Sequence, residues 1–254
     1  KEVMEMIPET LNLATASMID LGASSDMVAN TIHQFGLSAS QTTRVVDSFM
    51  IVANSANTDV LQLGQALGYT GTFAGALGVS VEETNAALGI LADSGIKGSL
   101  AGTQLRGVFA SLIKPTEKAS KALKRMGLEA HEVNPAMKSL EEVAAALARG
   151  KENLADKTTF ASEMLDIFGR RPVAAALALA NMNEKIGISV QKQKELTGAT
   201  EEAALAMEDT LFGALKALRS AMQEAWLVTG DGGFGGALRM LVDLMTGTVR
   251  VMAG

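Results

Sequence analysis

The side chains that could carry out chemistry are few in this chain and lie far apart in the sequence. Among its 254 residues there is no cysteine, and the two histidines are His33 and His131, so the chain offers no thiol nucleophile and no disulfide. The histidines share no metal-ligand spacing with each other or with carboxylates, and we expect neither to bind a metal. The paired acids Glu82–Glu83 and Glu201–Glu202 are typical of a first helical turn, where the helix dipole favours negative charge.

Sequence motifs of common enzyme classes are also missing. The chain has no nucleophile elbow, phosphate-binding loop or dinucleotide fingerprint. Closely spaced glycines such as Gly75 and Gly78 occur, but they follow helical patterns and no strand precedes them. We therefore expect no catalytic residue, no cofactor and no metal ion, and we predict that this chain is not an enzyme.

The composition indicates packed helices. Hydrophobic residues make up 48% of the chain but aromatic residues only 4%, and β-branched runs are scarce, which favours an all-α fold over sheets. We expect nine to twelve helices in a compact bundle packed through Gly and Ala, followed by a long amphipathic helix and an apolar C-terminal helix. The expected parts are an N-terminal helix at 1–24 that begins near Pro8, a helical core at 25–186, the long helix at 187–229, and a Gly-rich joint with the apolar helix at 230–254.

Two features indicate whether the chain is a fragment and whether it spans a membrane. The sequence begins at Lys1 and stops within an apolar pattern, so we expect a fragment of a longer chain. The longest uninterrupted apolar run is 173–180, far shorter than the ~20 residues that span a bilayer. We therefore do not expect a membrane protein.

Several helix ends can be predicted from local signals. Ser80 is followed three residues later by Glu83, the spacing of a capping box, and that helix is predicted to stop at Gly95. Ser38 with Gln41 has the same capping-box spacing. Both serines end an apolar-Gly-apolar-Ser pattern, of which residues 187–191 are a weaker third instance. The apolar spacing predicts a long helix from Ser189 to Val228, which Gly198 and Gly213 could interrupt.

A row of glycines precedes Ser80 at alternating intervals of four and three, the spacing of one helical face. Glycine within a helix costs roughly 1 kcal/mol relative to alanine, so we expect another helix to approach this face closely. That helix belongs either to the same domain or, across an oligomer face, to another copy of the protein or to a membrane helix; a turn at 68–71 is a third reading. The glycines are Gly64, Gly68, Gly71, Gly75 and Gly78.

A basic cluster follows this region, although the net charge of −6 argues against general nucleic-acid binding. Four cations fall at helical spacing on one face, which is either a solvated surface or a contact for DNA or an acidic partner. They are Lys114, Lys118, Lys121 and Arg125.

The segment ALGVSVEETNAALGILADSGIKGSLAGTQLRGVFASLIKP resembles the core region of phage tail tape measure proteins. The family pattern matches at 78–80, 91–98 and 102–106, with weaker matches at 35–38 with 46–47 and at 167–170, so that the resemblance covers roughly residues 25 to 180.

This resemblance implies a structural virion protein that acts in tail assembly, tail-length determination and genome ejection, with this fragment anchored at the tail tip or baseplate. It implies as partners the tail tube protein, tail tip or baseplate proteins, a tail-assembly chaperone and other copies in a trimer or hexamer, with host membrane contact during ejection and DNA contact left open. The protein would be made in the host cytoplasm and reside in the tail lumen or tip. The alternatives are a membrane-active helical module and a prophage-remnant scaffold.

Overall fold

The structure is a computed structural model that describes residues 2–154 and 156–210. Within these ranges every regular element is a helix and no strand occurs, which confirms the all-α prediction. Main-chain contacts divide the chain into two units, 1–203 and 204–254, and the account below concerns the first. The predicted division into four parts stays a prediction.

Eleven α-helices and two short 3-10 helices make up the described part of the first unit, and residues 199–210 are also helical. Their bounds are α1 Glu2–Ser17, α2 Leu21–Gln34, η1 Ala39–Gln41, α3 Thr42–Ser55, α4 Val60–Ala76, α5 Val81–Asp93, α6 Gly98–Ile113, α7 Glu117–Arg125, η2 Ala130–Val133, α8 Leu140–Glu152, α9 Lys157–Phe168, α10 Val173–Asn181 and α11 Asn183–Glu195.

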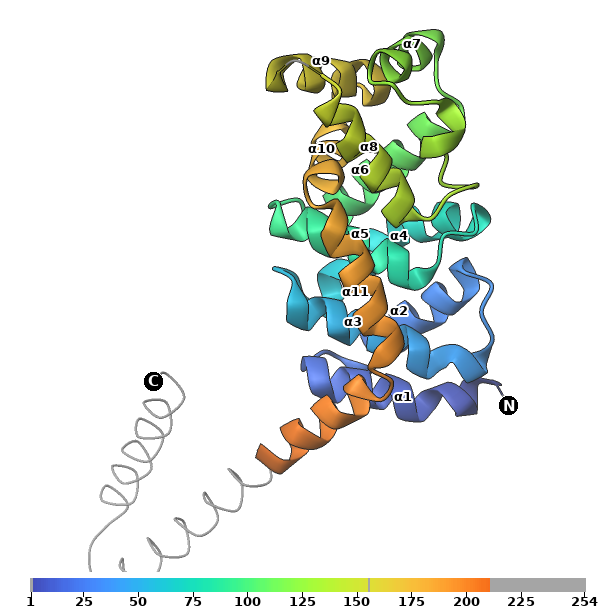
Figure 1. Ribbon diagram of the computed structural model, residues 1–254. Helices are drawn as coiled ribbons and strands as arrows, with labels where there is room; N and C mark the ends of the chain where they lie inside the picture. The colour runs from blue at the N-terminus through green and yellow to red at the C-terminus, as the bar shows by residue number, and fades with distance from the viewer. Residues whose placement is uncertain (1, 155, 211–254) are drawn as a thin grey trace, which may run out of the picture. The chain divides into compact units, whose positions relative to one another are not determined.

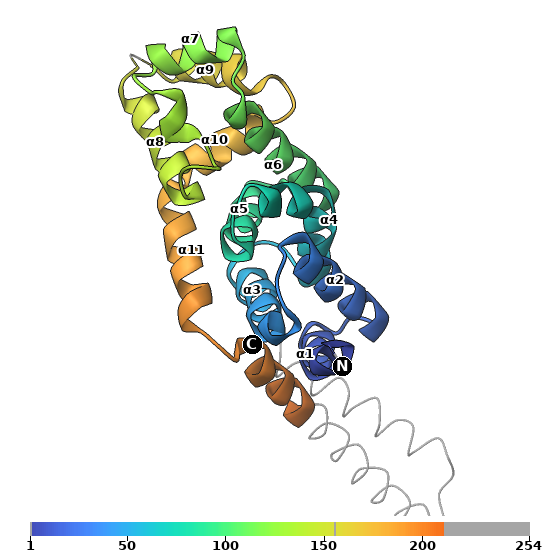
Figure 2. The same cartoon turned by 90° about the vertical axis from the view of Figure 1, so that its right-hand side faces the viewer.

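The helices of the first unit are layered in near-sequential order (Figure 1). At one end α1 packs on α2 and α3, the middle is formed by α4, α5 and α6, and α7 packs on α9 at the other end. After α10 the chain reverses, and α11 runs back along α8, α5 and α3, as Figure 2 also shows. The helix α5 therefore lies at the centre, and eleven of its thirteen residues are buried.

Helix ends form where the local signals predicted them. The Ser80 hydroxyl accepts a hydrogen bond from the main-chain N–H of Glu83 (3.2 Å), and the Glu83 carboxylate accepts one from the N–H of Ser80 (3.1 Å). This capping box satisfies two N–H groups that the first turn of α5 leaves free. Just before it, Gly78 has a φ of +78°, the left-handed conformation that ends α4 and that glycine adopts without strain.

Small residues allow the central helices to approach closely. Helices α4 and α6 cross where Gly102 lies against the main chain of Ala66, and a methyl group at position 102 would overlap the carbonyl oxygen of Ala66. The Gly/Ala packing predicted from composition is present at this crossing.

The structure corrects three expectations. The first helix begins at Glu2 rather than near Pro8, and Pro8 lies inside it as its seventh residue. Residues 187–191 lie inside α11 and form no cap. The helix predicted from Ser189 within 187–229 begins earlier, at Asn183. Its interruption after Glu195 and restart at Ala199 agree with the predicted break at Gly198, which has a φ of +88°. The rest of the predicted long helix and the apolar C-terminal helix at 230–254 lie outside the described residues.

Candidate functional site

Side chains suited to catalysis or metal binding do not converge in the described ranges. No group of three His, Cys, Asp or Glu residues there could hold a metal ion. His33 lies on α2 and His131 on η2, and both are exposed. Over the same ranges, no helix combines the length and apolar character that crossing a membrane requires.

The glycine face of α4 lies largely against α2 of the same chain. Side chains or main-chain atoms of α2 and its C-cap fill the space next to three of the five glycines: Met27 covers Gly64, the Gln34 side chain covers Gly71, and the main chain at Gln34 and Phe35 covers Gly75. In contrast, Gly68 has no neighbour within 4 Å of a Cβ position, and Gly78 lies beyond the end of the helix. An oligomer face at these residues stays a prediction, and Gly68 is the helical member of the set that remains uncovered.

The predicted basic face is largely paired with acids. On α7 the ammonium of Lys118 lies 2.6 Å from Asp166 and that of Lys121 lies 2.6 Å from Glu117. The two carboxylates that hold Lys118 and Arg125 come from α9, so they balance much of the positive charge of α7 and bind the two helices together.

Arg125 makes the strongest of these contacts. Its guanidinium donates to both oxygens of Glu163, at 2.7 and 2.6 Å, and also reaches Asp166 at 3.4 Å. The hydrogen bond to Glu163 raises the pKa of Arg125. Lys114 lies separately, at the end of α6 before the break that precedes α7.

Sequence reasoning missed an ion pair between α3 and α5 in which the acid is buried and the base is partly exposed. Glu82 was interpreted as a first-turn acid, but it is only 3% exposed and both of its oxygens accept from the guanidinium of Arg44 on α3. This hydrogen bonding raises the pKa of Arg44. The two residues are 38 positions apart, so no local spacing signals the pair.

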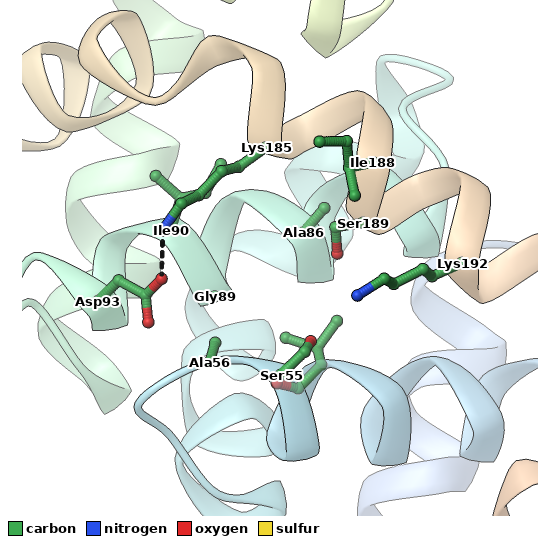
Figure 3. A pocket seen from close by; sticks show the side chains of 11 residues that line it. Ser55, Ala56, Ala86, Gly89, Ile90, Asp93, Lys185, Ile188, Ser189 and Lys192 are labelled. Carbon is green, nitrogen blue, oxygen red and sulfur yellow. Dashed lines mark hydrogen bonds and ion pairs between the residues drawn. The ribbon is translucent and has the colours of Figure 1, made fainter.

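A cavity of about 290 Å³ lies between α3, α5 and α11 (Figure 3). Its floor consists of small or apolar residues such as Ala56, Ala86 and Gly89, and α11 contributes Lys185 and Lys192. Lys185 pairs with Asp93 at 3.2 Å. The cavity holds no nucleophile with a base beside it, so it offers no catalytic arrangement.

Comparison with known proteins decides the family. The family model described as "Phage-related minor tail protein" matches residues 1–169, which is more than half of the chain. The chain belongs to this family. Its members are structural components of the phage tail, which places this protein in the virion.

Two curated relatives of this minor tail protein carry tape measure names. The "Tape measure protein" of Pneumococcus phage Dp-1 is 32% identical over 89% of the chain, and the "Probable tape measure protein" of Escherichia phage P2 is 31% identical over 97% of it. These matches confirm the resemblance inferred from the central segment. The chain spans 20% and 31% of the length of these two relatives. No solved structure matches it.

Proposed function

We propose that this region is the folded anchor of a tape measure protein, which fixes one end of that protein at the tail tip or baseplate while other parts of the full-length chain determine tail length. The observation that supports this most directly is the dense packing of the first unit. One continuous helix rises ~1.5 Å per residue, whereas α1 to α11 fold back on one another and α11 reverses along α5 and α3. A folded unit of this kind is suited to binding other proteins and contributes little length.

Exposed apolar side chains on α1 support a contact with another protein chain. Met4, Ile7 and Leu11 follow a spacing of three and four residues, which keeps them on one helical face, and between 49% and 74% of each remains exposed. Apolar side chains gathered on one exposed face mark interaction surfaces. We infer that this face meets a tail tip or baseplate protein, the tail tube, a tail-assembly chaperone, or another copy in a trimer or hexamer.

The remaining parts of the proposal concern tail assembly and genome ejection. The protein would be made in the host cytoplasm, enter the tail lumen during assembly and leave ahead of the genome during ejection, without enzymatic activity. Host membrane contact at that stage would involve the apolar pattern at 230–254, and DNA contact would involve cations that α9 leaves unpaired.

Immuno-electron microscopy of intact phage tests the anchoring role. Antibodies raised against residues 2–210 are applied to tails opened at either end. Label confined to one end of the tail is the expected result. Label spread along the tube would overturn the proposal, because it would place many copies of this region along the tail length.

Light scattering over a dilution series tests the oligomer. A stable trimer or hexamer is expected, and Leu11→Glu on the exposed α1 face should reduce its mass to that of the monomer. A wild-type monomer at all concentrations would contradict self-association and leave the contact to other tail proteins. A matched control is Leu165→Glu, an exposed leucine on α9, which should leave the mass unchanged.

A further inference from the structure

Residues 183–200, which we call the strap, comprise α11 and the turn that follows it. The strap leaves α10 at Met182 and lies across α8, α5 and α3 (Figures 1 and 2). It is therefore the segment through which the first unit is joined to the residues after 200. The contacts of the strap decide whether the helix that starts at residue 199 stays attached to α3.

The contact between the strap and the helices beneath it combines a polar network with one buried apolar side chain, Ile186, and the partly buried Val190. Only Ile186 and Gln193 of the thirteen residues of α11 are buried. The Gln193 amide donates to the main-chain carbonyl of Glu82 at 3.1 Å, and its oxygen accepts from the Ser48 hydroxyl at 2.6 Å. That hydroxyl in turn accepts from the Asn85 amide at 2.7 Å.

The end of the strap is held by a carboxylate from α3. Asp47, which is 2% exposed, accepts from the main-chain N–H of Gly198 at 2.7 Å and from that of Thr200 at 2.9 Å. A carboxylate at this position caps the helix that starts at residue 199, as an N-cap side chain would. Here the cap comes from a residue about 150 positions away, so the helix start depends on the strap staying in place.

The middle of the strap is poorly packed. The cavity of about 290 Å³ lies beneath it, above Ala86 and Gly89 (Figure 3). Ile188, on the cavity rim, stays 58% exposed. Protein interiors normally leave few voids of this size, and apolar burial supplies most of the free energy that holds helices together.

Polar contacts of this kind can be exchanged for water at low cost. An intramolecular hydrogen bond contributes little net free energy, because water replaces it in the open state. When the strap leaves, Asp47, Ser48 and Asn85 become hydrated, and the apolar side chains of α11 that lose their packing are the buried Ile186 and the partly buried Val190. In contrast, α5 is buried along nearly its whole length and cannot separate without unfolding the unit.

We propose that the strap is a releasable element that detaches from α3 and α5 as one body, pivoting at Met182, while α1 to α10 stay folded. Release removes the Asp47 cap and exposes a groove floored by small and polar residues. It thereby frees the start of the helix at residue 199 from α3. This inference rests on the contacts alone and does not depend on the proposed anchoring role.

Hydrogen exchange of the full chain, followed by mass spectrometry of its peptides, tests the proposal. Peptides from 183–195 should exchange together and at least 10-fold faster than peptides of α5 and α6. Asp47→Asn should speed exchange along the whole strap by a further 10-fold or more and leave α6 unchanged. Equal protection of α11 and α5 in the wild type, or an Asp47→Asn effect spread evenly over all helices, would overturn the proposal.

A matched control is available on α9. Asp156 also accepts from two main-chain N–H groups, those of Thr158 and Thr159, but it caps its own helix. Asp156→Asn should speed exchange only at the start of α9. If Asp47→Asn fails to fold, Ala86→Leu tests the same claim in the opposite direction: apolar volume added to the cavity should slow strap exchange several-fold, and no slowing would overturn the proposal.

Discussion

Gly102 on α6 lies directly against the carbonyl group of Ala66 on α4, so that the backbones of the two central helices touch. Replacement of Gly102 by Ala forces these backbones apart, which we expect to cost ~1–3 kcal/mol, more than the ~1 kcal/mol gained in helix propensity. Urea unfolding measures the change. The matched control is Gly68→Ala, where no atom lies within 4 Å of the added methyl; it should raise stability, and an equal loss in both variants would contradict the packing argument.

Glu83 accepts hydrogen bonds at the starts of both α5 and α8, so its removal should lower stability through both helices. One oxygen completes the Ser80 capping box and the other accepts from the main-chain N–H of Leu140, the first residue of α8, at 3.0 Å. We expect Glu83→Ala to lower the free energy of unfolding by about 1–2 kcal/mol. Glu142→Ala removes the same capping-box residue from α8 without a second helix and should cost clearly less in the same titration.

The capping boxes also show what could be predicted from sequence. Ser80 and Glu83 lie within one turn, so their types and spacing suffice to predict the helix start. The glycine spacing likewise predicts a close-packed face, but not that α2 covers it. Contacts such as Arg44 with Glu82, or Asp47 with Thr200, join residues 38 and 153 positions apart. They arise only from the packing order of the helices. The break at 196–198 is indicated in the sequence by Gly198, but the carboxylate of Asp47 that caps the following helix is not.

Glu9 gives the chain a pH-dependent stability. Burial raises the pKa of Glu9, and the nearby charges of Asp47 and Glu201 raise it further. Because the folded-state pKa of Glu9 lies above that of the unfolded chain, protonation of Glu9 favours the folded state. This contribution to stability is complete below the unfolded value near ~4.3 and is lost as pH rises through the folded pKa. Glu9→Gln should therefore raise the melting temperature at pH 7 but not at pH 4, by less than the equivalent of ~1 kcal/mol, since solvent screens the charges.

Differential scanning calorimetry at the two pH values measures this difference. Glu152→Gln is the control, because Glu152 is an exposed acid on α8. A Glu9→Gln variant that is equally stabilised at both pH values would contradict the electrostatic explanation and leave packing as the cause.

Acids on α9 should limit DNA binding by the basic face. Asp166 and Glu163 hold Lys118 and Arg125, so Glu163→Gln combined with Asp166→Asn should strengthen duplex DNA binding at low salt, because two cations become available to phosphates. Fluorescence anisotropy measures the affinity. The control, Glu152→Gln with Glu184→Gln, makes the same change in net charge elsewhere. Equal affinities of the two double variants would mean that net charge, rather than this face, governs binding.

Tail length is the measurement that best distinguishes an anchoring role of this region from a measuring role. A helical segment of ~40 residues, inserted between the exposed residues Ala136 and Met137 in the full-length phage protein, adds ~60 Å if this region serves as an extended ruler. If it is a folded anchor, the insertion loops out from the unit. Electron microscopy of the assembled tails should then show wild-type length, while the same insertion elsewhere in the full-length protein lengthens them. Tails lengthened by ~60 Å through the insertion at 136 would contradict the account.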